Sequence, residues 1–225
     1  MIHVAFFGDS ICVGQFVSPH ATWVVQLSRK LEGEFGDQIW VNNASHSGDT
    51  TRIGLERMAF DVCSHGVDVL YIQFGLNDCN FWTTDSGCAR VGADTFNANM
   101  VEMIERGRAA GATQVMIATN HPCLRSDKMT GQDFAYRESN AMYNKRIREV
   151  SKIAGVELID VETEFVRSGA ELKELLLPDG IHLSRAGHNA YVDLLTQPVF
   201  AAVKHTLRET GRVSPGHESG DRGGR

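Results

Sequence analysis

Several features of membrane, secreted and nucleic-acid-binding proteins are missing from this sequence. No apolar run approaches the roughly 20 residues that a membrane-spanning helix needs. No basic cluster interrupts the body of the chain, and the formal net charge is −6. A nucleic acid or an anionic membrane surface is therefore not expected as the main partner. No basic segment precedes an apolar stretch at the N-terminus, so no secretory signal is predicted.

Paired cysteine motifs are also missing. The five cysteines, an odd number, contain no C-x-x-C spacing, which argues against a zinc or redox motif. Reduced thiols and a cytoplasmic location are the expectation. Cys12 is interpreted as a small apolar filler of the core rather than as a nucleophile.

The common nucleotide and hydrolase signatures do not occur either. The chain has no G-x-G-x-x-G, no P-loop and no G-x-S-x-G elbow, so an α/β-hydrolase fold is disfavoured. What it does have is an apolar fraction of 42% in 225 residues, which is enough for a real core. A single domain over 1–210 is predicted, followed by a disordered tail over 211–225 that is rich in Gly, Ser and charge.

Strand and helix patterns alternate along the chain. Buried strands are indicated by short β-branched and apolar runs, and helices by apolar residues at helical spacing. The predicted strands are Ile2–Phe7, Ile39–Ala44, Val67–Phe74, Gln114–Thr119 and Val156–Val161. The predicted helices are His20–Leu31, Ile53–Cys63, Asp94–Ala110 with Asp94 as its N-cap, Tyr136–Ala154, Ala170–Leu177 and Arg185–Leu207. This alternation predicts an α/β fold with a five-stranded parallel sheet and helices on both faces.

Polar residues follow the predicted strands where ligands bind in such folds. Ser10 comes directly after the first strand, and Asn77 follows the third. A serine nucleophile needs a base, a group that orients the base, and donors for the oxyanion. Asp179 and His182, three residues apart in a Pro/Gly loop, suit the first two roles. Gly48 and Asn77 offer a backbone and a side-chain N–H as donors.

These residues resemble the four signature blocks of the SGNH (GDSL-type) hydrolases, in order. The blocks here are Gly8-Asp9-Ser10, Ser47-Gly48-Asp49, Gly75-Leu76-Asn77-Asp78 and Asp179-Gly180-Ile181-His182-Leu183. The first block continues with Ile11 where the family name has Leu, which is a packing difference. The second block lacks the longer Asn/Gly pattern seen in many members.

The resemblance, which covers about residues 2–195, implies a fold and an activity. The fold is a three-layer α/β/α sandwich resembling flavodoxin. The activity is metal-free and cofactor-free hydrolysis of short-chain acyl esters through an acyl-enzyme. Ser10 would be the nucleophile, His182 the base and Asp179 its orienting group. The N–H groups of Ser10 and Gly48 and the Asn77 amide would form the oxyanion hole.

Other residues near these blocks have alternative interpretations. Asp9 is interpreted as structural, as the N-cap after the first strand. Phe81 and Trp82 either line the substrate pocket or pack their loop onto the body. His121, after the fourth strand, is a candidate pocket residue or a hydrogen-bonded structural histidine. His46 and His188 are interpreted as structural.

The substrate is less well defined by the sequence. The polar segment 126–133 and the lack of a long apolar lid favour a small polar ester, with an acetylated sugar as the specific hypothesis. Acyltransferase, thioesterase or lysophospholipase chemistry with the same residues remains an alternative. So does a non-catalytic flavodoxin-like module that binds a small ligand.

Overall fold

A computed structural model describes residues 1–211. Apart from Gly211, the predicted tail at 211–225 lies outside the described residues. The strands are β1 (Ile2–Gly8), β2 (Ile39–Asn43), β3 (Val69–Gln73), β4 (Gln114–Ala118) and β5 (Glu157–Ile159). The α-helices are α1 (Ser10–Val13), α2 (Trp23–Phe35), α3 (Thr51–Asp61), α4 (Ala93–Ala109), α5 (Tyr136–Ala154), α6 (Val161–Arg167), α7 (Leu172–Leu175) and α8 (Arg185–Glu209). Short 3₁₀ turns are η1 (Pro19–Ala21), η2 (Gly36–Gln38), η3 (Cys63–His65) and η4 (Thr83–Asp85).

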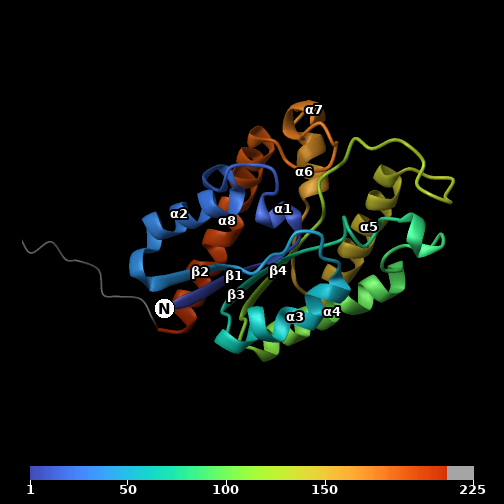
Figure 1. The fold of residues 1–225 in the computed structure, drawn as a ribbon. Coiled ribbons are helices and arrows are strands. Elements are labelled where there is room, and N and C mark those ends of the chain that lie inside the picture. The colour runs from blue at the N-terminus through green and yellow to red at the C-terminus, as the bar shows by residue number, and fades with distance from the viewer. Residues whose placement is uncertain (212–225) are drawn as a thin grey trace, which may run out of the picture.

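The five strands form one parallel sheet in the order β2-β1-β3-β4-β5. Every residue of β1 and of β3 is buried, as expected for strands covered on both faces. Helices α2 and α8 pack together on one face, and α3, α4 and α5 cover the other (Figure 1). The predicted three-layer α/β/α fold with a five-stranded parallel sheet is confirmed.

The strand order creates a natural place for a site. Strand β1 lies between β2 and β3, so the connections that leave β1 and β3 diverge to opposite faces of the sheet. In open α/β sheets this switch point leaves a crevice at the carboxyl ends of the strands. The segments that begin at Asp9 and at Phe74 start at this crevice.

Two predicted element boundaries are wrong for identifiable reasons. Asp94 lies inside the first turn of α4, and Gly92 occupies the N-cap position. The predicted fifth strand ends early because Asp160 caps a new helix, α6, by accepting a hydrogen bond from the Thr163 N–H. A seven-residue helix is too short to produce a clear periodic pattern, which explains why α6 was missed.

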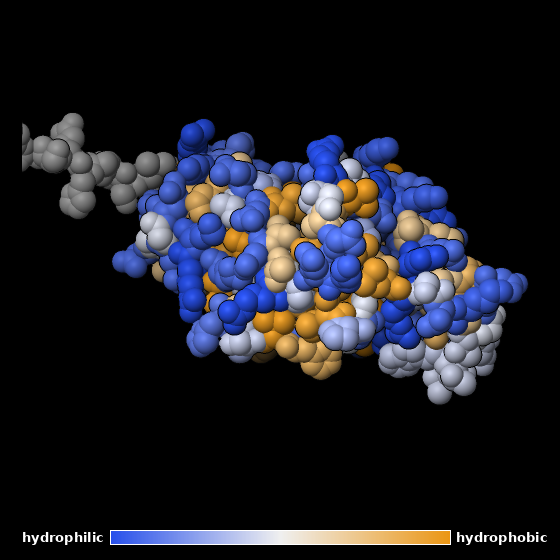
Figure 2. Space-filling view, turned by 90° about the horizontal axis from the view of Figure 1, so that it is seen from above, coloured by the Kyte–Doolittle hydropathy of each residue, from blue (hydrophilic) through white to orange (hydrophobic). Residues whose placement is uncertain are grey.

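The face seen from above is mainly hydrophilic, with apolar patches between polar residues (Figure 2). The most exposed large apolar side chains include Phe60, at 76%, and Phe16, at 70%. Scattered apolar residues are normal on a globular surface, but Phe16 lies next to the candidate site described below.

None of the helices within residues 1–211 is long and apolar enough to cross a membrane.

Candidate active site

The turn after β1 places Ser10 at the start of a helix. Asp9 is the N-cap of α1, and its Oδ1 accepts the Ile11 N–H at 3.0 Å. The amide of Ser10 therefore lies in the first turn, where N–H groups have no carbonyl partner within the helix. Gly8 is required at the end of β1, since a Cβ there would come within 2.6 Å of both the Cys12 sulfur and a backbone carbonyl. The interpretation of Asp9 as a structural cap is confirmed.

A loop near the C-terminus brings His182 to Ser10. The His182 Nε2 lies 3.0 Å from the Ser10 Oγ, and its Nδ1 lies 2.6 Å from the Asp179 Oδ2. The other carboxylate oxygen, Oδ1, accepts the backbone N–H groups of Ile181 and His182 at 2.9 and 3.0 Å. This turn fixes the carboxylate beside the ring of a residue only three positions later. The structure thus joins three predicted residues into one hydrogen-bonded series.

The environment keeps Asp179 ionised. Partial burial acts to raise the pKa of this carboxyl, but hydrogen bonds from the His182 ring and from the backbone amides outweigh it. The net result is a pKa below the ordinary aspartate value. An ionised Asp179 requires the proton of a neutral His182 ring on Nδ1, which leaves the Nε2 lone pair facing Ser10.

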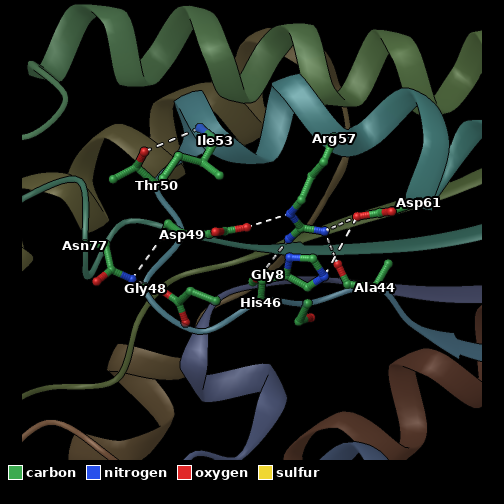
Figure 3. Close-up of polar contacts among 12 residues, drawn as sticks. Gly8, Ala44, His46, Gly48, Asp49, Thr50, Ile53, Arg57, Asp61 and Asn77 are labelled. Carbon is green, nitrogen blue, oxygen red and sulfur yellow. Dashed lines mark hydrogen bonds and ion pairs between the residues drawn. The ribbon is translucent and has the colours of Figure 1, made fainter.

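Gly48 and Asn77 are the other two donors that the sequence predicts for the site. Gly48 adopts a left-handed conformation with φ +84°, and no heavy atom lies within 4 Å of the position its Cβ would occupy. The Asn77 Nδ2 donates to the Asp49 carbonyl at 3.0 Å and has a longer contact of 3.4 Å to the Asp9 Oδ2 (Figure 3). One amide hydrogen of Asn77 is thus strongly held, and the other has only the weak contact.

Asp78 holds the loop after β3 in place through its contacts with Thr51. It is fully buried, and its Oδ1 accepts the backbone N–H and the hydroxyl of Thr51 at 2.9 and 2.5 Å. Burial raises its pKa to about 6 despite these hydrogen bonds. Asp78 is a supporting residue for which the sequence predicts no role. Its contacts show that it anchors the Asn77 segment to the first turn of α3.

His121 matches its interpretation as a hydrogen-bonded structural histidine rather than the one as a pocket residue. Its side chain is fully buried; Nε2 lies 2.7 Å from the Ile181 carbonyl, and Nδ1 lies 2.8 Å from the Tyr191 hydroxyl. Burial lowers its pKa to about 4, so the ring is neutral at pH 7. Since a carbonyl only accepts, Nε2 carries the proton and Nδ1 accepts from Tyr191. His121 therefore supports the loop that carries His182 from behind.

Phe81 and Trp82 lie along a cavity of about 480 Å³. Its lining residues are Asn80, Phe81, Trp82, Thr83, Thr84, Arg125 and Thr130. The Trp82 ring is half exposed and is covered on one face by the Arg90 guanidinium at 3.9 Å. Phe81 packs edge-on against Phe134, which agrees with the loop-packing alternative for this residue. Their contact with a substrate stays a prediction.

A second cavity, of about 500 Å³, borders Asp179. It is lined by Leu124, Arg125, Ser126, Asp127, Lys173, Leu176, Leu177, Pro178, Asp179 and Gly180. Arg125 belongs to both cavities, which places a guanidinium between them. Most of the polar lining comes from the predicted 126–133 loop and from the loop before His182.

Phe16 is a site neighbour that sequence reasoning missed. Its ring meets the His182 ring edge-on, with the centroids 5.1 Å apart. It has a φ of +69°, which is rare for a residue with a bulky side chain and is often found at functional sites. No sequence pattern marks a phenylalanine for this conformation. The Phe16 ring is therefore a direct neighbour of the His182 imidazole.

The remaining sequence candidates lie outside the hydrogen-bonded series of Ser10, His182 and Asp179. Cys12 is a buried free thiol 3.6 Å from the Gln73 Oε1, and burial raises its pKa far above the ordinary value. His188 is buried and accepts the Trp23 N–H at 3.2 Å. His46 is exposed and lies 4.0 Å from Asp61. Within residues 1–211, no group of three or more His, Cys, Asp or Glu side chains is arranged to hold a metal ion.

Asp9 has a consequence for stability that can be measured. Burial, with a smaller contribution from the neighbouring carboxylates, raises its pKa to about 7, against 3.8 for an ordinary aspartate. Between these values the folded protein retains a proton that the unfolded chain releases, so stability falls as the pH rises through this window. Asp9→Asn keeps an acceptor for the cap without the titration. We expect its melting temperature, relative to the wild type, to rise between pH 5 and pH 8.

The expected change in melting temperature follows from the difference between the pKa of Asp9 in the folded protein and in the unfolded chain. Each unit is worth about 1.4 kcal/mol, which corresponds to roughly 3–6 °C for a chain of this length. Thermal unfolding of both proteins at pH 5, 6, 7 and 8 measures it. A difference in melting temperature that stays constant with pH would contradict the raised pKa of Asp9.

A serine, an imidazole and a carboxylate in series at the carboxyl edge of a parallel sheet form the arrangement of the serine hydrolase class. The comparison with known families gives the more specific assignment. Residues 6–190 match the GDSL-like Lipase/Acylhydrolase family, and the chain belongs to it. The resemblance to the SGNH (GDSL-type) hydrolases is thereby confirmed, and the protein is a carboxylic ester hydrolase.

One curated relative agrees with this assignment, and two solved structures share the fold. An arylesterase of Vibrio mimicus is 26% identical over 175 residues, which is 78% of this chain and 76% of the relative. The structure of a lipase/acylhydrolase from Enterococcus faecalis has a TM-score of 0.67 and 24% identity, covering 96% of this chain and all of the other. An acetylxylan esterase from Geobacillus stearothermophilus has a TM-score of 0.69 and 20% identity, with 93% and 94% of the two chains covered.

Proposed function

We propose that the protein hydrolyses acetyl and other short-chain acyl esters of a small polar substrate, such as a sugar, through an acyl-enzyme on Ser10. The observation that carries this proposal is the hydrogen-bonded series from the Ser10 Oγ to the His182 Nε2 at 3.0 Å and from its Nδ1 to Asp179 at 2.6 Å. An esterase needs this geometry because an alcohol hydroxyl is a weak nucleophile until a base removes its proton.

In the first step, Ser10 attacks the ester carbonyl while His182 accepts its proton on Nε2. The ionised Asp179 stabilises the imidazolium that forms and keeps the ring in the required tautomer. His182 then donates this proton to the leaving alcohol. A water molecule repeats the sequence on the acyl-enzyme, and Ser10 is restored when the acid leaves.

The negative charge on the carbonyl oxygen needs donors already in place. The Ser10 amide is available because it lies in the first turn of α1. The Gly48 amide and the second hydrogen of the Asn77 Nδ2 are the other two proposed donors. Gly48 suits this role because no side chain separates its backbone from the carbonyl oxygen.

The proposed substrate class is supported by the cavity beside Phe81, which shares Arg125 with the cavity that borders Asp179. Threonine hydroxyls, an asparagine amide and a guanidinium line it together with two aromatic rings. Hydroxyl-rich rings suit such a surface, because their C–H faces pack on aromatic rings while their hydroxyls bond to the polar groups. The Geobacillus protein of the same fold is an acetylxylan esterase, which agrees with this class.

The alternatives to ester hydrolysis are other acyl reactions that use the same catalytic residues and a ligand-binding module that uses no catalytic residues. Acyltransferase, thioesterase and lysophospholipase reactions differ in the acyl acceptor or in the acyl group and leaving group, not in the proposed catalytic residues. The family assignment favours an ester hydrolase over a non-catalytic ligand-binding module.

A series of p-nitrophenyl esters tests the proposed acyl preference. We expect kcat/KM to be highest for acetate, propionate or butyrate and to fall at least tenfold by octanoate. Acetylated xylose should be deacetylated, and added xylose should not divert the acyl group from water. A maximum at octanoate would overturn the short-chain proposal, and preferential acetylation of the added sugar would identify an acyltransferase.

A further inference from the structure

Arg57, which is not one of the proposed catalytic residues, connects several segments next to the site. The Arg57 guanidinium, on α3, contacts Asp49 through Nε at 2.6 Å and Asp61 through Nη1 at 2.8 Å. It also donates to the carbonyl of Ala44 and, at 3.4 Å, to that of Gly8 (Figure 3). Its side chain is only 13% exposed. A buried guanidinium with this many partners fixes their relative positions because its donors have a planar, rigid geometry.

Asp49 connects this arginine to the proposed oxyanion donors. Its side chain binds the arginine, its carbonyl accepts the Asn77 Nδ2 at 3.0 Å, and it directly follows Gly48. One residue thus holds the amide of Asn77 and borders the Gly48 N–H. The contact with Gly8 reaches the strand end two residues before Ser10, the third donor.

The segment around Gly48 has other restraints: the His46 N–H donates to the Gly8 carbonyl at 3.1 Å, and the exposed Ser47 hydroxyl donates to the Gln15 Oε1. Its internal turn bond, from the Asp49 N–H to the His46 carbonyl, is 3.4 Å long. The contact from Arg90 to the Gly48 carbonyl, at 3.3 Å, is exposed to solvent. The buried, charge-assisted pair between Arg57 and Asp49 is shorter than either and is less screened by water.

We propose that Arg57 is a positioning residue of the oxyanion hole, which holds Asp49 so that the Gly48 N–H and the Asn77 amide converge on one point. The inference rests on the proposed function. The arginine does not contact the substrate. Its effect should therefore appear in kcat rather than in KM, because the oxyanion exists only in the transition state.

The first variant is Arg57→Gln. We expect kcat to fall about 10-fold to 100-fold with KM within about threefold, since misplacing a donor costs less than deleting it. Asn77→Ala, which deletes a donor, should cost about 10²–10³. Arg57→Lys, which keeps the charge but not the fork of donors, should recover part of the loss.

A structural defect alone would give a different pattern. Rates are therefore normalised to the fraction of sites that a phosphonate ester labels at completion. A boronic acid that mimics the tetrahedral intermediate should bind at least tenfold more weakly to Arg57→Gln. The control is Arg106→Gln, because Arg106 ties α3 to α4 through the Leu55 carbonyl at 3.0 Å and should leave both readouts unchanged.

Removing the arginine also leaves the buried carboxylate of Asp49 unpaired, which is itself destabilising. The double variant Asp49→Ala/Arg57→Ala removes both charges together with the contact between them. If positioning is the cause, kcat per labelled site stays at least tenfold low in this variant. A return to the wild-type kcat would assign the loss to the unpaired charge and overturn the inference.

The remaining outcomes separate the inference from the proposed function. Wild-type protein without Ser10-dependent ester hydrolysis would overturn both. Two results would overturn the positioning role alone, provided that the wild type shows Ser10-dependent activity. In the first, Arg57→Gln keeps its kcat and its affinity for the boronic acid. In the second, Arg57→Gln changes only KM.

Discussion

Replacing Ser10 by alanine should lower kcat for a p-nitrophenyl acetate substrate by about 10⁴–10⁶. The Ser10 Oγ is the atom that the His182 Nε2 faces at 3.0 Å, so its removal leaves the base without a nucleophile to activate. The proposed oxyanion donors and the binding surface remain, which accounts for the residual rate expected over water. Steady-state kinetics, with a melting temperature to confirm folding, measure the loss.

Cys12 provides the control for this variant. It is the other nucleophilic side chain near the turn, but it is buried, and burial raises the pKa of its thiol far above the physiological range. Cys12→Ala should therefore keep kcat within about threefold. Full activity in Ser10→Ala together with lost activity in Cys12→Ala would reverse the assignment of the nucleophile.

Replacing Asp179 by asparagine should cost about 10³–10⁴ in kcat. The Asp179 Oδ1 is held by two backbone N–H groups, so the asparagine oxygen is expected to keep this place. Its NH₂ group would then face the His182 Nδ1 and donate to it. The ring proton would move to Nε2 and point at Ser10, where it blocks proton transfer.

Asp37→Asn is the matched control, because Asp37 is exposed and precedes β2 at the opposite edge of the sheet. It should keep the wild-type kcat. The tautomer can be read directly from the ¹⁵N shifts of the His182 ring. A ring that stays protonated on Nδ1 in Asp179→Asn, or a kcat within tenfold of the wild type, would contradict this account.

The sequence contains the main elements of the site because each is a local signal. Ser10 follows a buried strand and a glycine, and Asp179 and His182 share one short turn. The spatial relation between Ser10 and His182, 172 positions apart, was predicted through the family resemblance rather than from the residues themselves. The structure supplies the 3.0 Å contact that no local pattern contains.

The supporting residues could not be predicted in the same way. His121 follows a strand like a site residue, but its contacts with Tyr191 and Ile181 depend on α8 and on the loop before it. Arg57 resembles any polar residue of an amphipathic helix. Its four partners come from the end of β1, from the loop between β2 and α3, and from its own helix. Burial and tertiary packing decide these roles, and neither is encoded in a short window.

Covalent labelling of Ser10 tests the central claim most directly. A p-nitrophenyl phosphonate ester should release one p-nitrophenol per protein and leave one adduct, which peptide mass spectrometry assigns to Ser10. The adduct should be absent from Ser10→Ala and should form far more slowly in His182→Ala. Stoichiometric labelling of another residue, or equal labelling of the Ser10→Ala protein, would contradict the account.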